Sequence, residues 1–312
     1  MKIFVTGVCG QLGHDVVYEA KKRNYDVIGS DIHEFYSGVV DESDIMQQAY
    51  IQLDITNDSE VKATIQKIHP DVIIHCAAWT AVDAAEDPAN YIKVRSINVD
   101  GTRHIAEAAK EVNAKMVYIS TDYVFNGQGS EPWKPDCEDF APLNVYGQSK
   151  LDGEIAVRSI IHKYFIIRIA WVFGVNGKNF IKTMLNVGKT RDTVNVVSDQ
   201  IGTPTYTVDL ARLLVDMIET EKYGYYHATN SEDGEYISWA DLAEESYRIA
   251  GMDVKVNHVT TAEYGLSVAA RPFNSRLDKS KLKDMGFDPL PHWKDAVARY
   301  IREVKLQYEF QI

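Results

Sequence analysis

A tyrosine and a lysine four residues apart, Tyr146 and Lys150, are the pair of side chains best suited to acid–base chemistry. The surrounding stretch Asn144–Ile161 has helical periodicity, so both side chains lie on one helix face, one turn apart. A phenol titrates near about pH 10, and a neighbouring ammonium lowers that pKa by favouring the phenolate. The pair can therefore pass a proton to a carbonyl oxygen that is being reduced. Taken alone, the same spacing also fits an ordinary helix surface.

A hydroxyl group is expected beside this pair. Thr121 follows a predicted buried strand at Lys115–Ser120, and the carboxyl end of such a strand points toward the ligand side of a parallel sheet. From there its hydroxyl would orient the carbonyl oxygen. Thr121, Tyr146 and Lys150 are the predicted catalytic set.

Three glycines, Gly7, Gly10 and Gly13, lie between a predicted strand at Lys2–Thr6 and a predicted helix at Gln11–Arg23. The first allows a tight turn, the second lets the backbone approach a pyrophosphate, and the third lets the helix pack close to the sheet. The phosphates would face the free N–H groups of the helix N-terminus. A tight turn without a nucleotide is the alternative.

An acidic residue at the end of the second predicted strand bears on the coenzyme. Asp31 lies eighteen residues after Gly13 and directly follows Asp26–Ser30. A carboxylate there accepts hydrogen bonds from ribose hydroxyls and repels a 2′-phosphate, which favours NADH and leaves NADPH open. A solvated loop acid is the alternative interpretation.

The order of the predicted elements indicates an α/β fold. Short apolar runs alternate with amphipathic ones over the first 170 residues, which predicts a Rossmann-type, doubly wound parallel sheet. The predicted strands are Lys2–Thr6, Asp26–Ser30, Asp71–Cys76, Lys115–Ser120 and Tyr164–Ile169. The predicted helices are Gln11–Arg23, Ser59–Ile68, Ala89–Val112 and Asn144–Ile161.

The remaining chain, 171–312, is predicted to form a smaller C-terminal α/β substrate-binding lobe, partly interleaved with the dinucleotide-binding domain 1–170. Its predicted helices are Asn179–Gly188, Val208–Thr220, Ser238–Ala250 and His292–Leu306. Its predicted strands are Asn195–Val197, Tyr225–Ala228 and Lys255–His258. The acidic segment His33–Gln52 is expected to be a surface loop.

Composition excludes several classes of protein. The net charge of −12 argues against a general affinity for nucleic acid, whose binding depends on neutralising phosphates. No apolar run approaches the roughly 20 residues of a membrane helix. The N-terminus runs directly into a predicted apolar strand, so secretion is not expected, and the three cysteines lie far apart without paired metal spacing. A cytoplasmic enzyme with neither a membrane nor a nucleic-acid partner is expected.

The glycine loop, the strand-end threonine and the Tyr-x-x-x-Lys pair resemble those of the extended short-chain dehydrogenase/reductases. A narrower resemblance, to the dTDP-4-dehydrorhamnose reductase family, covers nearly the whole chain. Five segments carry it: Ser120–Phe125, Pro142–Lys150, Arg168–Phe173, Asp199–Thr205 and Arg271–Leu277. The resemblance implies NAD(P)H-dependent reduction of the C4 ketone of dTDP-4-dehydro-β-L-rhamnose to dTDP-β-L-rhamnose, with a dTDP-linked deoxy-ketosugar as the partner.

The resemblance also implies site residues. Catalysis would fall to Thr121, Tyr146 and Lys150. Cofactor contacts would come from Gly7, Gly10, Gln11, Leu12 and Gly13 at the phosphates, Asp31 at the ribose, Asp54 and Ile55 at the adenine, and Ala77, Ala78, Trp79 and Thr80 at the nicotinamide, together with Tyr146 and Lys150. Substrate contacts would come from Thr121, Asp122, Trp171, Gln200, Thr205, Arg271, Asn274 and Arg276.

Several of these residues have a plainer alternative. Trp171 ends a buried strand and would also fit the core, although a 6-deoxysugar suits an aromatic face. Arg271 and Arg276 suit diphosphate oxygens, but Arg276 would equally pair with a surface acid. The Gly-x-Pro before Thr205 is also simply a turn.

Other questions stay open at this point. Some members of the family use magnesium at a subunit contact, and here the sequence predicts no metal ligands, although Asp15 lies on the first predicted helix. The chain would be a monomer or a homodimer. Three rival functions remain: a nucleotide-sugar epimerase or dehydratase on the same scaffold, a reductase of another nucleotide-4-ketosugar, and a non-catalytic dinucleotide-binding subunit like that of methionine adenosyltransferase. A dehydratase would typically place an acidic pair beside Thr121, whereas Asp122 is followed by Tyr123.

Overall fold

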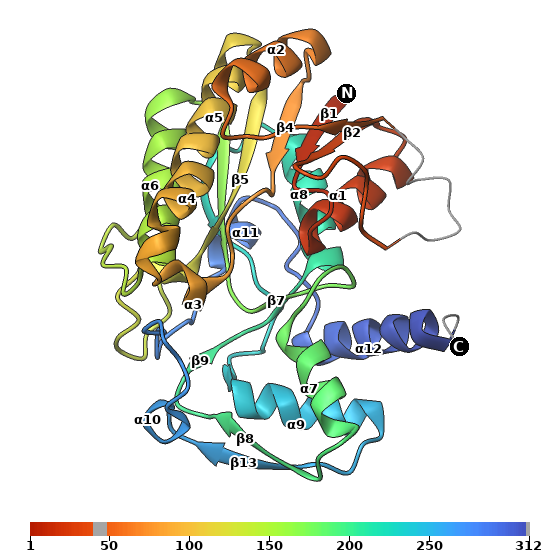
Figure 1. Cartoon of the computed structure of the whole chain (residues 1–312), viewed down its shortest axis with the longest axis vertical. Coiled ribbons are helices and arrows are strands. Elements are labelled where there is room, and N and C mark those ends of the chain that lie inside the picture. The colour runs from red at the N-terminus through yellow and green to blue at the C-terminus, as the bar shows by residue number, and fades with distance from the viewer. Residues whose placement is uncertain (40–48, 310–312) are drawn as a thin grey trace.

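The computed structural model describes residues 1–39 and 49–309, with side chains to residue 305. Its centre is a seven-stranded sheet in the order β11-β6-β5-β4-β1-β2-β3, with every neighbouring pair parallel (Figure 1). The strands are β1 (Lys2–Thr6), β2 (Asp26–Asp31), β3 (Tyr50–Gln52), β4 (Val72–His75), β5 (Lys115–Thr121), β6 (Tyr164–Ile169) and β11 (Gly224–His227). This sheet confirms the predicted doubly wound fold.

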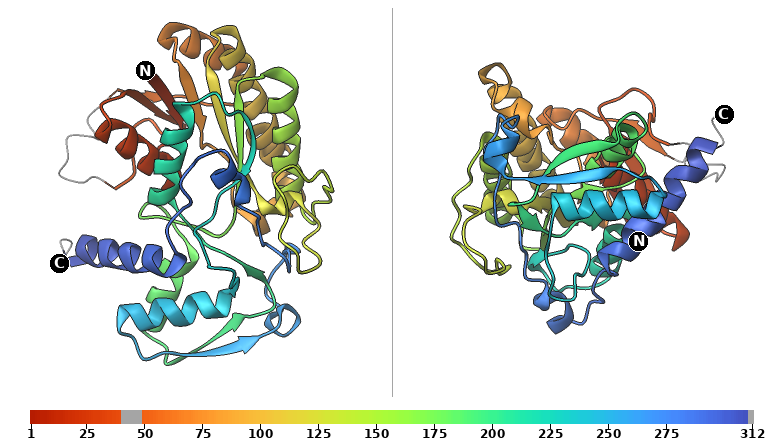
Figure 2. Two further views of the ribbon diagram at one scale, coloured as in Figure 1. Left: turned by 180° about the vertical axis from the view of Figure 1, so that it is seen from behind. Right: turned by 90° about the horizontal axis from the view of Figure 1, so that it is seen from below.

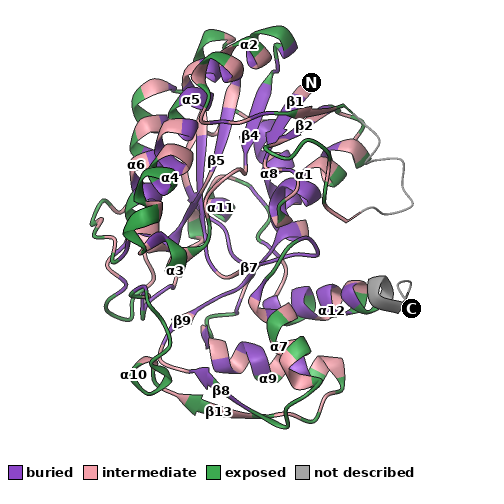
Figure 3. Ribbon diagram, viewed as in Figure 1, coloured by how far each residue is buried: buried purple, intermediate pink, exposed green. Residues whose placement is uncertain are grey.

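Helices cover both faces of the sheet, so its central strands are buried on both sides (Figures 1, 2 and 3). Two helices pack together on one face: α1 (Gln11–Lys22) and α8 (Thr207–Ile218). Three cover the other: α2 (Asp58–Ile68), α5 (Thr102–Glu111) and α6 (Val145–Ile160). Each layer encloses its own apolar core, and the sheet supplies alternate side chains to both.

A second group of elements lies beyond the carboxyl ends of the strands (Figure 1). Its helices are α7 (Phe180–Gly188), α9 (Trp239–Ala250), α10 (Thr261–Tyr264) and α12 (Trp293–Glu309). Its strands pair two by two: β7 (Val172–Phe173) with β10 (Thr205–Tyr206), β8 (Thr193–Val197) with β13 (Lys255–Val259), and β9 (Ile201–Gly202) with β12 (Ile237–Ser238). Three elements from the second half of the chain, β11, α8 and α11 (Ser280–Asp284), pack with the sheet. The chain therefore crosses several times between the sheet and this second group of elements.

The predicted helix Ala89–Val112 is helical without a break from Tyr91 to Glu111, but it is not α-helical throughout: α4 (Tyr91–Arg95) continues into the π-helical η3 (Ser96–Gly101) and then into α5. Two short elements come before α4, namely α3 (Val82–Ala85) and η2 (Pro88–Asn90). The π-helical η3 turns Asn98 inward, where its side chain accepts a hydrogen bond from the Trp79 backbone at 2.8 Å and donates one to Ser149 at 2.9 Å. Strand β3 and the short turn η4 (Asp122–Val124) were not predicted. Of the expected loop 33–52, residues 40–48 lie outside the described residues.

Within the described part of the chain, no helix is both long and apolar enough to cross a membrane.

Candidate active site

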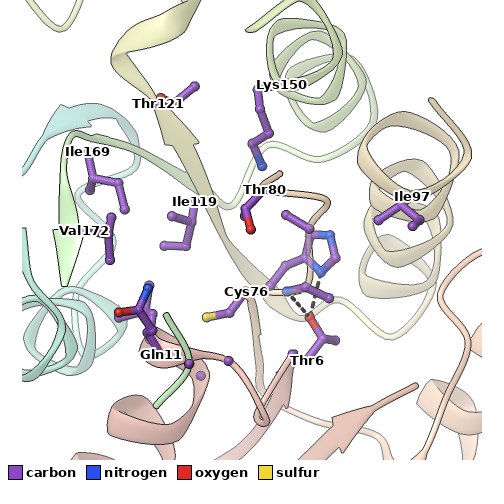
Figure 4. Close-up of a pocket in the computed structure, with 18 of the residues that line it drawn as sticks. Thr6, Gln11, Cys76, Thr80, Ile97, Ile119, Thr121, Lys150, Ile169 and Val172 are labelled. Carbon is purple, nitrogen blue, oxygen red and sulfur yellow. Dashed lines mark hydrogen bonds between the residues drawn. The ribbon is translucent and has the colours of Figure 1, made fainter. Parts of the chain in front are cut away.

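The candidate site is a cavity of about 910 Å³ between the carboxyl ends of the central strands and the second group of elements (Figure 4). It lies at the crossover between β1 and β4, where the chain switches from one side of the sheet to the other. This is the usual ligand position in an open α/β sheet. Most of the predicted cofactor residues and all three predicted catalytic residues line it.

The glycine loop is built as its spacing predicts. Gly7 has a φ of +72°, and a Cβ there would lie 2.6 Å from the Ala77 backbone nitrogen. A Cβ on Gly13 would lie 2.3 Å from the Gly7 carbonyl oxygen, so only glycine lets α1 pack this close to the turn. Helix α1 begins after Gly10, which provides no side-chain cap, and its first N–H groups are therefore available to an anion.

Asp31 is the last residue of β2 and lies beside this loop. Its Oδ2 accepts a hydrogen bond from the Cys9 backbone N–H at 3.0 Å, which ties the glycine loop to β2. Asp54 and Ile55 follow β3 and line the same end of the cavity, although an Asp54 oxygen already accepts bonds from the backbone and hydroxyl of Thr56. The end of the cavity that suits an adenosine thus contains every residue predicted there.

The predicted catalytic pair comes from the start of α6. The Asn144 side chain caps this helix by accepting a hydrogen bond from the Gly147 N–H at 2.7 Å. One turn of helix therefore separates Tyr146 and Lys150, as their spacing predicts. The Lys150 side chain is 3% exposed and extends into the cavity from the side of α6 (Figure 4).

Burial shifts the ionisation of both groups. Desolvation lowers the pKa of Lys150 to about 7, against the opposing attraction of Glu154 and Cys76. Desolvation raises the pKa of Tyr146, and the negative charge of Asp122 adds to the rise, while the Thr121 hydroxyl opposes it. The lowering expected from a neighbouring ammonium is therefore outweighed by burial in this structure. The Lys150 ammonium lies 4.2 Å from the centre of the Tyr118 ring, a cation–π contact inside the protein.

The Thr121 hydroxyl is held by its neighbours. It accepts a hydrogen bond from the Tyr123 N–H at 3.3 Å and donates to the Asp122 carboxylate at 3.0 Å. Ser275, from the C-terminal part of the chain, donates to the other oxygen of Asp122. Burial raises the pKa of Asp122 to about 6, and the two hydroxyl donors limit that rise.

At the opposite wall, Ala77, Ala78 and Thr80 line the cavity after β4. Trp79 is not among the described residues that line the cavity. Its indole N–H donates instead to the Ala81 carbonyl at 3.0 Å. Trp171 faces the cavity with a φ of +51° and stacks on Trp239, their ring centres 4.0 Å apart. The two indoles give this wall an aromatic face.

The comparisons with known proteins agree with this geometry. The family model described as the RmlD substrate binding domain matches residues 1–306. The chain belongs to this family. A dTDP-4-dehydrorhamnose reductase of Streptomyces griseus is 40% identical over 79% of this chain and 81% of its own length. The Clostridium acetobutylicum reductase structure is 40% identical, covers 98% of this chain and 100% of its own, and has a TM-score of 0.87. A Bacillus anthracis reductase solved with NADP is 39% identical, with 97% and 99% coverage and a TM-score of 0.86.

Five residues with a predicted substrate role in this RmlD-family chain lie outside the described lining of the cavity: Gln200, Thr205, Arg271, Asn274 and Arg276. Each engages other parts of the protein. Arg271 pairs with Asp83 of α3 at 2.6 Å, and the Thr205 hydroxyl donates to the Ala170 carbonyl at 2.6 Å. The Gln200 side chain donates to Thr261, and Asn274 donates to the Glu131 carbonyl and accepts from Arg276. Their substrate roles remain predictions.

The structure adds residues that sequence reasoning missed. Tyr118, Ser275 and Trp239 each contact a predicted site residue, and each contact joins segments that are distant in the sequence. Gln11, predicted at the phosphates, also receives hydrogen bonds from the Gly174 N–H at 2.8 Å and from Asn179 at 3.0 Å. It thereby links the glycine loop to the second group of elements. Asp15 is buried on α1, where desolvation raises its pKa to about 7.

Proposed function

We propose that this chain is an NAD(P)H-dependent reductase that converts the C4 ketone of dTDP-4-dehydro-β-L-rhamnose to the alcohol of dTDP-β-L-rhamnose. The observation that carries the proposal is the convergence of Thr121, Tyr146 and Lys150 on one end of a cavity whose other end is formed by the glycine loop and Asp31. The names of the relatives support the choice of sugar and nucleotide.

The residues of the chain fit a nicotinamide dinucleotide. The first N–H groups of α1 have no side-chain cap and would bind the pyrophosphate of the dinucleotide. The glycines would let the backbone of this loop approach that pyrophosphate closely. The bound dinucleotide would supply the hydride that adds to C4. Lys150 would hold the nicotinamide ribose and stabilise the developing phenolate of Tyr146.

Tyr146 is the proposed general acid. As C4 gains its hydride, the ketone oxygen takes a proton from the Tyr146 hydroxyl, and the charged Lys150 beside it lowers the cost of the phenolate. This role requires the ammonium form of Lys150. Because burial holds the pKa of Lys150 at about 7, turnover is expected to decline as the pH rises through that range.

Thr121 is proposed to orient the ketone oxygen. One hydroxyl carries one proton, and that proton is directed at Asp122 in the structure. Donation to the substrate therefore requires Thr121 to turn away from Asp122, while Ser275 continues to hold the carboxylate. Trp171 and Trp239 are proposed to pack on the C–H face and methyl group of the deoxysugar.

Coenzyme preference is proposed to favour NADH, because the Asp31 carboxylate accepts ribose hydroxyls and repels a 2′-phosphate. The enzyme is proposed to act in the cytoplasm, where its free cysteines would remain reduced, as a monomer or homodimer without nucleic-acid or membrane partners.

The proposal is tested with Tyr146→Phe and dTDP-4-dehydro-β-L-rhamnose generated in situ, following coenzyme oxidation and the formation of dTDP-rhamnose. Loss of the acid is expected to lower turnover by roughly 10²–10⁴-fold. Tyr123→Phe is the matched control, because Tyr123 also lines the cavity. Its ring packs edge-on against that of Tyr146, with the ring centres 5.6 Å apart, but Tyr123 does not belong to the helix that carries Lys150. Similar losses in the two variants, or normal turnover in Tyr146→Phe, would remove the assigned role.

A further inference from the structure

The Asp31 carboxylate is already surrounded by donors. Besides the Cys9 N–H, it accepts the backbone N–H of Ile32 at 2.9 Å, and its Oδ1 lies 2.8 Å from Nδ1 of His33. The Asp31 side chain is only 11% exposed, whereas the His33 side chain is 59% exposed. The imidazole therefore lies on the solvent side of the carboxylate.

Both residues line the candidate cofactor cavity, at the end that fits the adenosine ribose. From Ile32 to Val39, the described stretch after β2, His33 is the only basic side chain. The described lining residues include two lysines, Lys150 from α6 and Lys178 from the segment before α7, and neither belongs to this stretch. The basic group available from the β2 end is thus a histidine, which exists either as a cation or as a neutral imidazole.

Among the described residues, few other ionisable groups face this imidazole. Asp31 of β2 contacts it directly, and Glu34 follows it in the chain. Cys9 of the glycine loop lies close enough for its sulfur, an Asp31 oxygen and a His33 ring nitrogen to fall within 4.8 Å of one another. Tyr50 of β3 donates its hydroxyl to the His33 carbonyl. Within the described part of the chain, Asp31 is therefore the dominant charge that His33 meets.

We propose that His33 selects the coenzyme: its cationic form neutralises Asp31 and offers a positive partner to the 2′-phosphate of NADPH. With His33 neutral, the Asp31 carboxylate faces the 2′ position unopposed, which favours the 2′-hydroxyl of NADH. NADPH is accepted when His33 is protonated, so the ratio of NADPH to NADH affinity is expected to be higher in acidic than in alkaline solution. The inference rests on the dinucleotide site of the proposed function but not on the identity of the sugar.

The test measures binding of two adenosine fragments, 2′,5′-ADP and 5′-AMP, by calorimetry at pH 6 and pH 8. In the unmodified protein the affinity ratio of 2′,5′-ADP to 5′-AMP is expected to be about 10-fold more favourable at pH 6 than in His33→Gln, a difference of about 1.4 kcal/mol. At pH 8 the difference between the two proteins is expected to be smaller. The 2′-phosphate itself titrates in this range, and comparing the two proteins at the same pH removes the contribution of the free fragment.

Two further variants sharpen the result. His33→Lys carries a cation at both pH values and is expected to keep the 2′,5′-ADP preference at pH 8. His258→Gln is the matched control, since His258 is also exposed and pairs with an acid, Glu244, but on α9 and β13. It is expected to bind both fragments as the unmodified protein does.

The proposal would be overturned if, at pH 6, the affinity ratio of 2′,5′-ADP to 5′-AMP were the same in the unmodified protein and in His33→Gln. It would also be overturned if neither fragment bound. Coenzyme oxidation with the ketosugar separates this inference from the proposed function. If fragment binding depends on pH but no turnover is seen, the role of His33 is retained and the reductase assignment is wrong.

Discussion

The cation–π contact between Tyr118 and Lys150 predicts a shift in the pH profile of the enzyme. Both side chains are buried, and the ammonium lies 4.2 Å from the ring centre. Such a contact contributes about 2 kcal/mol when desolvated. Replacing Tyr118 with leucine removes it, and because one pKa unit corresponds to about 1.36 kcal/mol, the pKa of Lys150 is expected to fall by about 1.5 units.

The effect on activity follows from the fraction of Lys150 that carries a charge. With a pKa of about 7, half of the lysines are charged at pH 7. A pKa about 1.5 units lower leaves about one in thirty charged at the same pH, so kcat/KM for Tyr118→Leu is expected to be about 15-fold lower there. At pH 5 the two enzymes should differ little. The assay is the initial rate of coenzyme oxidation across pH 5 to 9.

Tyr118→Phe is the control, because it keeps the aromatic ring and removes only the hydroxyl, which donates to the Lys150 carbonyl at 3.2 Å. Its pH profile is expected to match that of the unmodified enzyme. The position of the alkaline limb is the readout, since partial unfolding of a variant lowers the rate at every pH without moving the limb. A limb in Tyr118→Leu that coincides with the unmodified one, or an equal displacement in Tyr118→Phe, would refute the reasoning.

Two other perturbations test the scaffold of the site. Gly13→Ala places a Cβ 2.3 Å from the Gly7 carbonyl oxygen, which must displace the start of α1 at a cost of about 1–3 kcal/mol. The affinity for NADH, measured by calorimetry, is therefore expected to fall. Unchanged affinity would contradict the role of this glycine. Arg168→Met leaves Glu154 buried without its partner at 2.8 Å, and urea unfolding should show a loss of about 3–5 kcal/mol. The double variant Arg168→Met/Glu154→Leu should recover most of that loss, and a double variant as unstable as the single one would show that the pair does not act through buried charge.

The parts of the site that sequence predicts are those formed by short stretches of chain. The turn of Gly7 and the helix start after Gly10 lie within one strand–loop–helix segment, and the spacing of Tyr146 and Lys150 lies within one helix turn. Local periodicity and backbone geometry determine such features. The parallel sheet was predictable for the same reason, since each of its buried strands forms a separate apolar run.

What sequence did not predict depends on contacts between distant segments. Ser275 reaches Asp122 across 153 positions, and Trp239 stacks on Trp171 from a helix of the second group of elements. Arg271, which suits the diphosphate by its chemistry, pairs in the structure with Asp83, an acid 188 positions away, and its substrate role remains a prediction. The π-helical turn that directs Asn98 inward was not predicted either.

The most direct test of the central claim is the fate of the hydride. Reduced coenzyme that carries deuterium at both positions of nicotinamide C4 is incubated with the protein and dTDP-4-dehydro-β-L-rhamnose, and the product is examined by NMR. The account predicts one deuterium at C4 of the sugar in dTDP-rhamnose, and loss of the transfer in Tyr146→Phe. Oxidation of the coenzyme without deuterium at that carbon, or binding of the coenzyme without transfer, would contradict it.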